Sequence, residues 1–223
     1  NEKIDDLCHT LKEFAQIMES YKVTAYKAYG TSAIRETENT LILQDQIEQR
    51  TGIWVDVVTG GTNELLARIA GEADAPVCDV IFGGGVESLT AYERYFQPYA
   101  CAEADLIRPG LRPADDLWTP FSSLPVVLIY NTKLVSPGEL TGWESLLSGR
   151  WSGSIALADP AVSGSSYTAA ATMLCALPGD DWDQLDRLAV QLEGRVLPDS
   201  GDVVAAVAGG SCRVGVTLEE TAL

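Results

Sequence analysis

The sequence predicts an α/β protein with two lobes and mostly parallel sheets. Short apolar segments alternate with helical segments along the chain, and in the first hundred residues each apolar segment ends in a Gly/Ser/Thr loop before a helix. The chain has 223 residues, of which 46% are hydrophobic and 21% charged, which suits one large domain or two lobes of about 100 residues each.

The first hundred residues predict three strand–helix units that follow an N-terminal amphipathic helix. Leu7, Leu11 and Phe14 recur at helical spacing, and the pair Thr51-Gly52 is a typical glycine stop for a helix. The expected helices are 4–20, 34–50, 63–70 and 88–95, and the expected strands are 23–29, 54–58 and 77–82.

The rest of the chain predicts a second lobe, entered through a strongly apolar strand at 124–131. Further strands are expected at 153–157 and 213–218, and helices at 143–147, 167–177, 181–192 and 203–208. The expected domains are therefore an N-terminal helix at 1–22, a first lobe at 23–125 and a second lobe at 126–223.

Charge and composition disfavour several functional classes. A net charge of −17 repels phosphodiester backbones, so we expect no nucleic-acid partner. No apolar run is long enough for membrane insertion, and the start NEKIDDL does not resemble a signal peptide. Five scattered cysteines and the single histidine His9 predict no disulfide framework, no metal site and no cofactor.

Three loops could bind a ligand, because each offers backbone N–H groups and small hydroxyls at a predicted helix N-terminus. Such a terminus favours anions, and glycine allows close approach. The alternative is that they are ordinary turns and helix caps. The loops are Thr59, Gly60, Gly61 and Thr62; Gly83, Gly84 and Gly85; and Ser163, Gly164, Ser165 and Ser166.

Composition changes sharply near residue 53. All ten prolines and all five tryptophans follow it, whereas four of the five lysines precede it. The two parts therefore suggest two origins.

The part from residue 53 resembles the extracellular solute-binding proteins of ABC importers, in the group of ferric-iron, phosphonate and organophosphate binders. The segments VDVVTGGTNELLARI, CDVIFGGGVESL, VVLIYNT, WSGSIALADP, VSGSSY and AAVAGGSCRVGVTLEE carry the resemblance. It implies a type II periplasmic-binding-protein-like fold, incomplete at its C-terminus, with a small anionic solute between the lobes. It also implies an ABC permease as partner, an extracytoplasmic location, and Tyr130, Asn131 and Thr132 as binding positions beside the three loops.

One position departs from the iron binders of this group. They carry a tyrosine pair after the last strand, where this chain has Glu219 and Glu220. The resemblance therefore favours a phosphonate, organophosphate or carboxylate over ferric iron, and the glutamates could pair with an ammonium group of the same solute.

The first part resembles the exopolyphosphatase and guanosine pentaphosphate phosphatase family. The motif consists of Thr31, Ser32, Ala33, Ile34, Arg35 and Glu36, and the resemblance places it beside a phosphate site. The glycine-rich loop that this family has upstream is absent. The family also has an acidic pair after the next strand, and Glu64 is the nearest candidate for it here. Residues 79–85 resemble a later glycine-rich loop of the family only weakly.

We therefore expect a binding module, not an enzyme, made by a fusion in which a phosphatase-like strand–helix unit replaces the first such unit of a binding protein. In that fusion 23–58 forms two parallel strands joined by one helix. The alternatives are a fragment of a phosphohydrolase that uses Arg35 and Glu64, and an engineered chimera without a working site.

Overall fold

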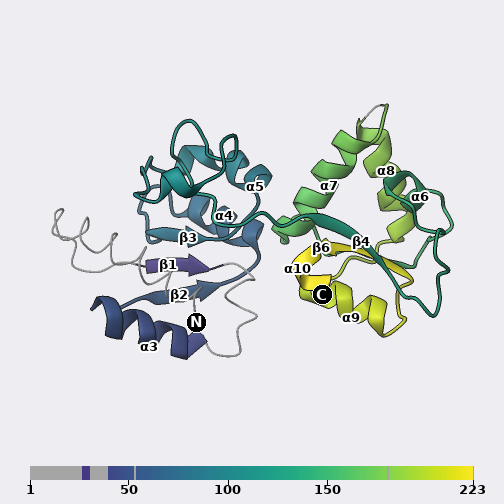
Figure 1. Ribbon diagram of the computed structural model, residues 1–223, viewed down its shortest axis with the longest axis horizontal. Helices are drawn as coiled ribbons and strands as arrows, with labels where there is room; N and C mark the ends of the chain where they lie inside the picture. The colour runs from purple at the N-terminus through teal and green to yellow at the C-terminus, as the bar shows by residue number, and fades with distance from the viewer. Residues whose placement is uncertain (1–26, 31–39, 53, 180, 223) are drawn as a thin grey trace. The chain divides into compact units, whose positions relative to one another are not determined.

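The computed structural model describes residues 27–30, 40–52, 54–179 and 181–222 (Figure 1). Its contacts divide the chain into two compact units, Asn1–Gly83 and Gly84–Leu223. This division comes earlier than the expected boundary between 125 and 126, because α5 (Val86–Ala91) packs against α7 (Gly164–Ala176). The expected helix at 4–20, and with it the segment 1–22, lies outside the described residues.

The first unit contains a parallel sheet in the order β2-β1-β3. The central strand β1 (Lys27–Gly30) pairs with β2 (Asp56–Thr59) on one side and with β3 (Val80–Phe82) on the other. Helix α3 (Thr40–Thr51) lies between β1 and β2 in the chain. The expected parallel pairing of these two strands is confirmed, with α3 between them among the described residues, and the phosphatase-like part supplies the middle of the sheet.

The helices α3 and α4 (Thr62–Gly71) contribute most of the buried apolar side chains described in this unit. Leu65 and Leu66 of α4 and Ile47 of α3 are at most 3% exposed. The Gln44 side-chain amide donates to the carbonyl of Val55, which ties α3 to the start of β2. Gly52 ends α3 with a φ of +72°, a conformation that glycine adopts without strain, so the expected glycine stop is confirmed.

The second unit contains a mixed sheet in the order β4-β6-β5. Strand β6 (Val214–Leu218) runs parallel to β5 (Ile155–Ala156) and antiparallel to β4 (Val126–Tyr130). Five helices accompany the sheet in the described residues between 126 and 222: α6 (Trp143–Leu146), α7, α8 (Asp181–Leu192), α9 (Gly201–Ala208) and α10 (Glu219–Ala222). All of these except α10 were expected from the sequence.

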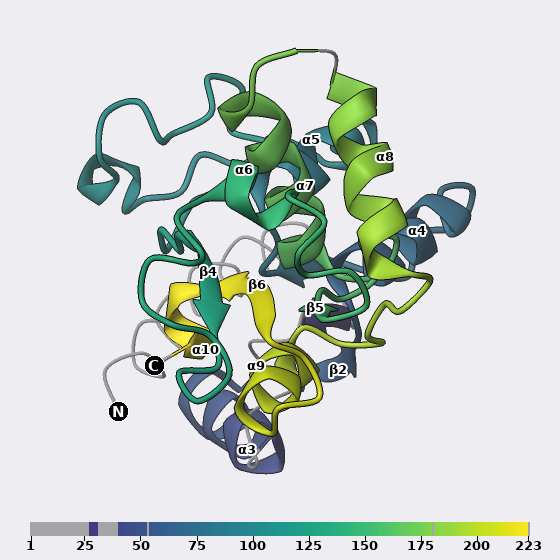
Figure 2. The ribbon, with the colours of Figure 1, turned by 90° about the vertical axis from the view of Figure 1, so that its right-hand side faces the viewer.

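The helices of the second unit cover both faces of this sheet, as Figures 1 and 2 show from two sides. Val214 and Val216 pack with the apolar side chains of α7 and α8, in a cluster that also contains the buried Trp151. On the other face Gly215 approaches α9 so closely that a Cβ atom there would lie 2.9 Å from Val207 Cγ2. Alternation along β6 thus separates the two apolar cores of this unit.

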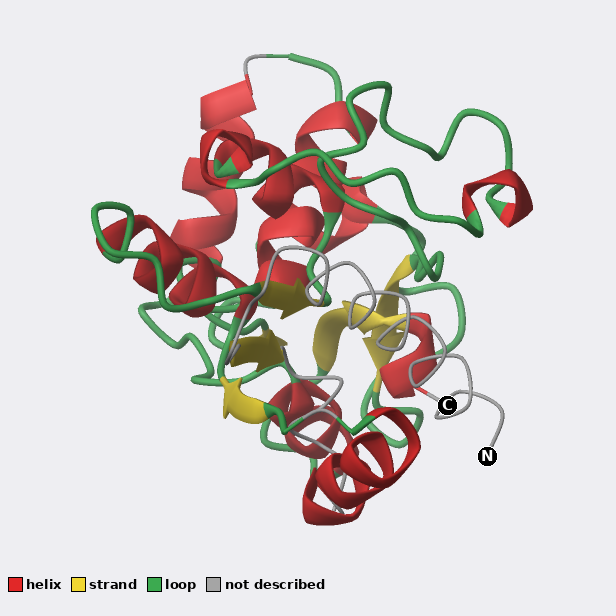
Figure 3. Ribbon diagram, turned by 90° about the vertical axis from the view of Figure 1, so that its left-hand side faces the viewer, coloured by secondary structure: helices red, strands yellow, loops and turns green. Residues whose placement is uncertain are grey.

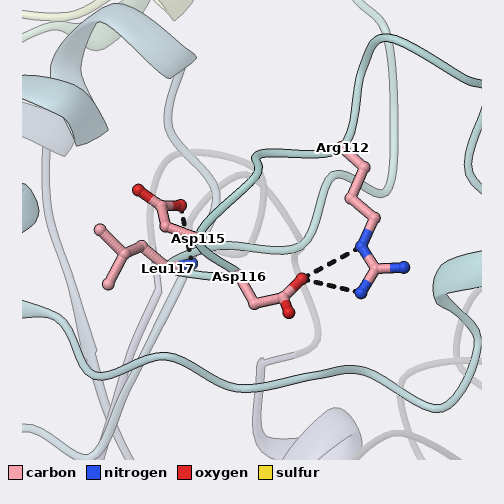
Figure 4. Close-up of polar contacts among 4 residues, drawn as sticks. All are labelled: Arg112, Asp115, Asp116 and Leu117. Carbon is pink, nitrogen blue, oxygen red and sulfur yellow. Dashed lines mark hydrogen bonds and ion pairs between the residues drawn. The ribbon is translucent and has the colours of Figure 1, made fainter.

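The stretch from α5 to β4 is mostly irregular (Figure 3). The expected helix at 88–95 is split into α5 and a 3₁₀ turn at Glu93–Tyr95, and a second such turn covers Ala104–Leu106. Further on, Asp116 adopts a φ of +54°, and its Oδ1 accepts hydrogen bonds from Nε and Nη2 of Arg112 at 3.0 and 2.9 Å (Figure 4). Local polar contacts, not a regular ladder, hold this loop.

None of the helices in the described part of the chain combines the length and the hydrophobicity needed to cross a membrane.

Candidate functional site

The N-terminus of α7 gathers the serines that the sequence singled out. The helix begins at Gly164, three residues earlier than expected, and Ser163 is its N-cap. The Ser163 hydroxyl accepts from the backbone N–H of Ser166 at 3.4 Å and lies 3.0 Å from the Ser165 hydroxyl. Ser163 and Ser166 are 6% and 3% exposed, whereas Ser165 is only half-buried. Ser165 therefore offers the most accessible hydroxyl at this end of the helix.

The electrostatics of this terminus favour negative charge. The helix has 13 residues and no acidic side chain in its first turn, so no carboxylate of that turn offsets the positive end of its dipole. Several arginines of the second unit already bond to groups of the protein. These arginines are Arg94, Arg112, Arg150, Arg187 and Arg195.

The loop Thr59–Thr62 leads into α4, and this helix end is capped by its own acid. Gly61 is the N-cap, and its backbone N–H donates to Oε2 of Glu64 at 3.3 Å. Thr62 is 6% exposed. An anion arriving at this loop would compete with the Glu64 carboxylate, so the loop is a weaker anion site than the end of α7. Glu64 acts here as a capping residue.

The loop Gly83–Gly85 leads into α5, whose first turn touches α7. Gly83 and Gly84 have φ values of +103° and +98°, so two consecutive positions favour glycine. Gly85 is the N-cap of α5, and a Cβ atom on it would lie 2.5 Å from Thr168 Oγ1. Within the second unit the structure thus brings Gly85 close to the helix that starts with Ser163–Ser166.

The predicted binding positions Tyr130, Asn131 and Thr132 lie elsewhere in the second unit. Tyr130 pairs with Val214 at the beginning of β6, whereas the loop before α7 follows the carboxyl end of β5, toward which β6 also runs. Ile155 and Ala156 of β5 pair with Val214 and Gly215 on the other side of β6, so β6 lies between Tyr130 and the strand that precedes the α7 loop. The Asn131 side chain donates to the carbonyl of Val207 at 2.8 Å and accepts from the N–H of Lys133, and Tyr130 packs on the apolar core. The geometry gives Tyr130 and Asn131 structural contacts.

The acidic pair Glu219 and Glu220 forms the first turn of α10, directly after β6, and both side chains are exposed. Thr217, two residues earlier, is 3% exposed, and its hydroxyl has no hydrogen-bond partner. Among the described residues no group of three His, Cys, Asp or Glu side chains could hold a metal ion. The motif Thr31, Ser32, Arg35 and Glu36 lies outside the described residues.

Comparison with known proteins decides the family. The family model described as bacterial extracellular solute-binding protein matches residues 75–208. The chain belongs to this family. A second model, the Ppx/GppA phosphatase family, matches residues 1–89, so the two matches overlap at 75–89 and the phosphatase match runs past the expected junction at 53. Both resemblances are thereby confirmed.

Among curated proteins, this solute-binding protein resembles iron uptake protein A1 of Synechocystis sp. (strain ATCC 27184 / PCC 6803 / Kazusa). The two are 32% identical over 122 residues, which cover 53% of this chain and 33% of that protein. The same organism's iron uptake protein A2 is 30% identical over 104 residues, or 45% and 30% of the two chains. The matched stretch thus spans about a third of these curated relatives.

A solved structure with the same fold is the periplasmic binding protein AfuA from Actinobacillus pleuropneumoniae with fructose-6-phosphate bound. Its TM-score is 0.69 at 20% identity, over 89% of this chain and 64% of that one. The expected type II periplasmic-binding-protein-like fold is confirmed. The family matched over residues 75–208 and the AfuA structure are solute-binding proteins, and the curated relatives are iron uptake proteins, which agrees with the expectation of a binding module and not an enzyme.

Proposed function

We propose that this chain is the solute-binding component of an ABC-type importer, which acts outside the cytoplasm and passes a small anionic solute to a membrane permease. Membership of the solute-binding family supports the general role. The solute class is a phosphonate, an organophosphate or a carboxylate. The observation that carries this choice is the end of α7, where serine hydroxyls meet a helix terminus without an acid in its first turn.

The chemistry of that terminus suits an oxyanion. The first N–H groups of a helix have no partner within it, and they point along the axis toward whatever occupies the end. Ser165 adds a half-buried hydroxyl within 3.0 Å of the Ser163 oxygen. Hydrogen bonds to a charged group contribute about 1.5–3 kcal/mol each, so a few of them suffice for micromolar affinity.

The other predicted loops would contribute less. At Thr59–Thr62 the Glu64 carboxylate already accepts the Gly61 N–H, so a bound anion would have to displace it. At Gly83–Gly85 the donors are backbone groups of a loop that glycine keeps free of side chains. We therefore assign the anion to Ser163, Gly164, Ser165 and Ser166, and treat Tyr130, Asn131 and Thr132 as outside the contact set.

Ferric iron is the second candidate, because the two curated relatives are named iron uptake proteins. Against it stands the absence of a group of three His, Cys, Asp or Glu side chains that could hold a metal ion among the described residues. An exposed glutamate pair also follows β6, where tyrosines would serve iron better. An organophosphate agrees better with the α7 terminus, and the AfuA structure holds fructose-6-phosphate.

Isothermal titration calorimetry would test this proposal with methylphosphonate, glucose-6-phosphate, citrate and ferric citrate. We expect binding of at least one of the iron-free anions to the wild type, and a loss of about tenfold or more in Ser165→Ala, because one charge-assisted hydrogen bond disappears. The matched control is Ser148→Ala, an exposed serine of the same unit that lies outside the α7 terminus.

Equal affinities of the wild type and Ser165→Ala for every anion would contradict the assignment, as would binding of neutral sugars alone. Binding of ferric citrate without binding of citrate would favour iron. Release of phosphate from polyphosphate, lost in Arg35→Ala, would favour the phosphatase alternative.

A further inference from the structure

Helix α8 presents apolar side chains on both its inner and its outer face. Leu188 and Leu192 are buried in the core of the second unit, as an amphipathic helix requires. Trp182 and Val190 nevertheless are each 74% exposed. Residues 182, 186 and 190 follow one another at intervals of four, so these two side chains share a stripe of about 12 Å on one side of the helix. The burial of α8 does not account for this stripe.

A groove borders the stripe at its C-terminal end. It has a volume of about 330 Å³ and is lined by Leu147, Gly149, Ser152, Asp186, Arg187, Val190 and Gln191. Its size is at the lower end of the range for small binding sites and suits one or two large side chains. Gln191 is 4% exposed, and its side-chain oxygen accepts from the N–H of Gly149, which links α8 to the loop on the other side of the lining.

The charged side chains around the groove differ in whether they already have a bonding partner within the protein. The guanidinium of Arg187 donates to the carbonyl of Leu147 and to the side chain of Gln184, and Arg150 pairs with Glu139 while it lies over the Trp151 ring. Asp183 and Asp186 of α8 have no ion-pair or hydrogen-bond partner among the residues that the structure describes. Arg187 keeps its positive charge because its partners are neutral, but Asp183 and Asp186 outnumber it, so the net charge beside the stripe is negative.

We propose that this surface, formed by Trp182, Asp183, Asp186, Val190 and the adjoining groove and here called the α8 face, docks a basic amphipathic helix of another protein. The apolar side of that helix would cover Trp182 and Val190 and place one side chain in the groove. Its lysines or arginines would meet Asp183 and Asp186. Trp anchors and desolvated pockets with a polar rim are the features that dominate binding at protein interfaces.

The charge of the molecule excludes two other occupants. A second copy of this chain would bring a further net charge of −17 and another pair of α8 aspartates to the contact. An anionic lipid surface would be repelled by the same carboxylates. The proposal does not depend on the solute proposed for the α7 terminus, because it involves only α8 and the 147–152 loop.

The test uses the full chain and a synthetic helical peptide of leucine and lysine with one apolar face. Its controls are a scrambled peptide of the same composition and a leucine–glutamate counterpart. We expect the leucine–lysine peptide to shift the backbone NMR signals of α8 and of residues 147–152. We also expect the double variant Trp182→Ser/Val190→Ser to bind it at least tenfold more weakly. Leu106→Ser, which removes the 80% exposed Leu106 of the same unit, is the matched control and should bind like the wild type.

The scrambled peptide measures the attraction that a net charge of −17 exerts on any cationic chain. Equal binding of the scrambled peptide would overturn the proposal, as would unchanged affinity in the double variant or signal shifts confined to other elements. If the wild type bound anionic vesicles more strongly than the leucine–lysine peptide, the partner would be a lipid surface, and the proposal would also be overturned. Circular dichroism would confirm that both variants remain folded, which we expect because the substituted side chains are exposed.

Discussion

Thr168 of α7 donates its hydroxyl hydrogen to the carboxylate of Glu87 in α5, over a distance of 2.9 Å and across 81 positions of the chain. The contact is close because Gly85 has no side chain: a Cβ atom there would lie 2.5 Å from the same hydroxyl oxygen. One glycine thus permits the hydrogen bond that joins the first turn of α5 to α7.

Gly85→Ala should break this hydrogen bond, because Thr168 must rotate away from the new methyl group. We expect a loss of about 1–2 kcal/mol in the free energy of unfolding, in the range of other overpacked contacts. Thr168→Ala alone should cost about 0.5–1.5 kcal/mol, and the double variant should lose less than the sum of the two. Urea unfolding measures all three. Gly71→Ala, where no atom lies within 4 Å, is the control, and strict additivity would argue against the contact.

Gly215→Ala should destabilise the second unit by about 1–3 kcal/mol, because its methyl group would press on Val207 at 2.9 Å and on Val203 at 3.0 Å. Both valines are at most 4% exposed and cannot move into solvent. Val207→Ala should recover part of this loss when it is combined with Gly215→Ala, although on its own it leaves a cavity. Thermal unfolding of the two single variants and the double variant would show the recovery, and its absence would contradict the packing described for β6 and α9.

Cys212 should make the second unit less stable at high pH. Burial raises the pKa of its thiol above the ordinary value of 9.0, against smaller lowering effects of the Arg195 charge and the Ser211 hydrogen bond. Because its pKa is higher in the folded state, the thiol holds its proton more tightly there than in the unfolded state. Its contribution to the free energy of unfolding is therefore fully present below the ordinary pKa, and it is lost as the pH rises through the raised pKa of the folded state. The wild type should therefore lose more free energy of unfolding than Cys212→Ala between roughly pH 8 and pH 10. Equal slopes would show that the thiol does not contribute.

The same burial should slow the reaction of Cys212 with thiol reagents. Its thiolate is less populated at neutral pH, whereas the thiol of Cys175 is exposed. Mass spectrometry after brief treatment with a maleimide should find Cys175 labelled before Cys212. Labelling of Cys212 at the same rate would contradict the burial of its side chain.

Ala28→Pro should disrupt the first unit. Residue 28 pairs with Val57 on one side and with Val80 on the other, and proline cannot donate a hydrogen bond to either neighbour in the middle of a sheet. We expect the loss of at least about 3 kcal/mol and rapid proteolysis within the first unit. Ala28→Ser keeps the backbone N–H and is the control. A proline variant as resistant as the serine variant would show that β1 is not essential to the sheet.

Most described elements could be predicted from apolar periodicity and glycine stops, because both signals are local. Helix α8 matches its expected bounds, and β6 begins one residue later than expected. The antiparallel direction of β4 could not be predicted, because strand direction depends on partners distant in the chain. The start of α7 also differs from the expected one, because Gly164–Ser166 were expected to be part of a loop, whereas Ser163 is the N-cap and the helix begins at Gly164.

The candidate site could be predicted in part. The serines before α7 were found because an N-cap serine in a βα loop has a recognisable composition. The capping of α4 by Glu64 was missed, although glutamate three residues after an N-cap is the usual sign of such a contact. The roles of Asn131 and Thr168 could not be foreseen, because their partners lie 76 and 81 positions away.

The strand orders of the two sheets have a consequence for the path of folding. The sheet of the first unit needs no residue beyond Phe82, so it can form while the chain is still being synthesised. In the second unit β6 lies between β4 and β5 but follows both in the chain, and Val126 pairs with Leu218. Such distant pairings raise the contact order and slow folding. Until Leu218 is available, β4 and β5 lack their common neighbour, so their strand edges stay unpaired after the sheet of the first unit has formed.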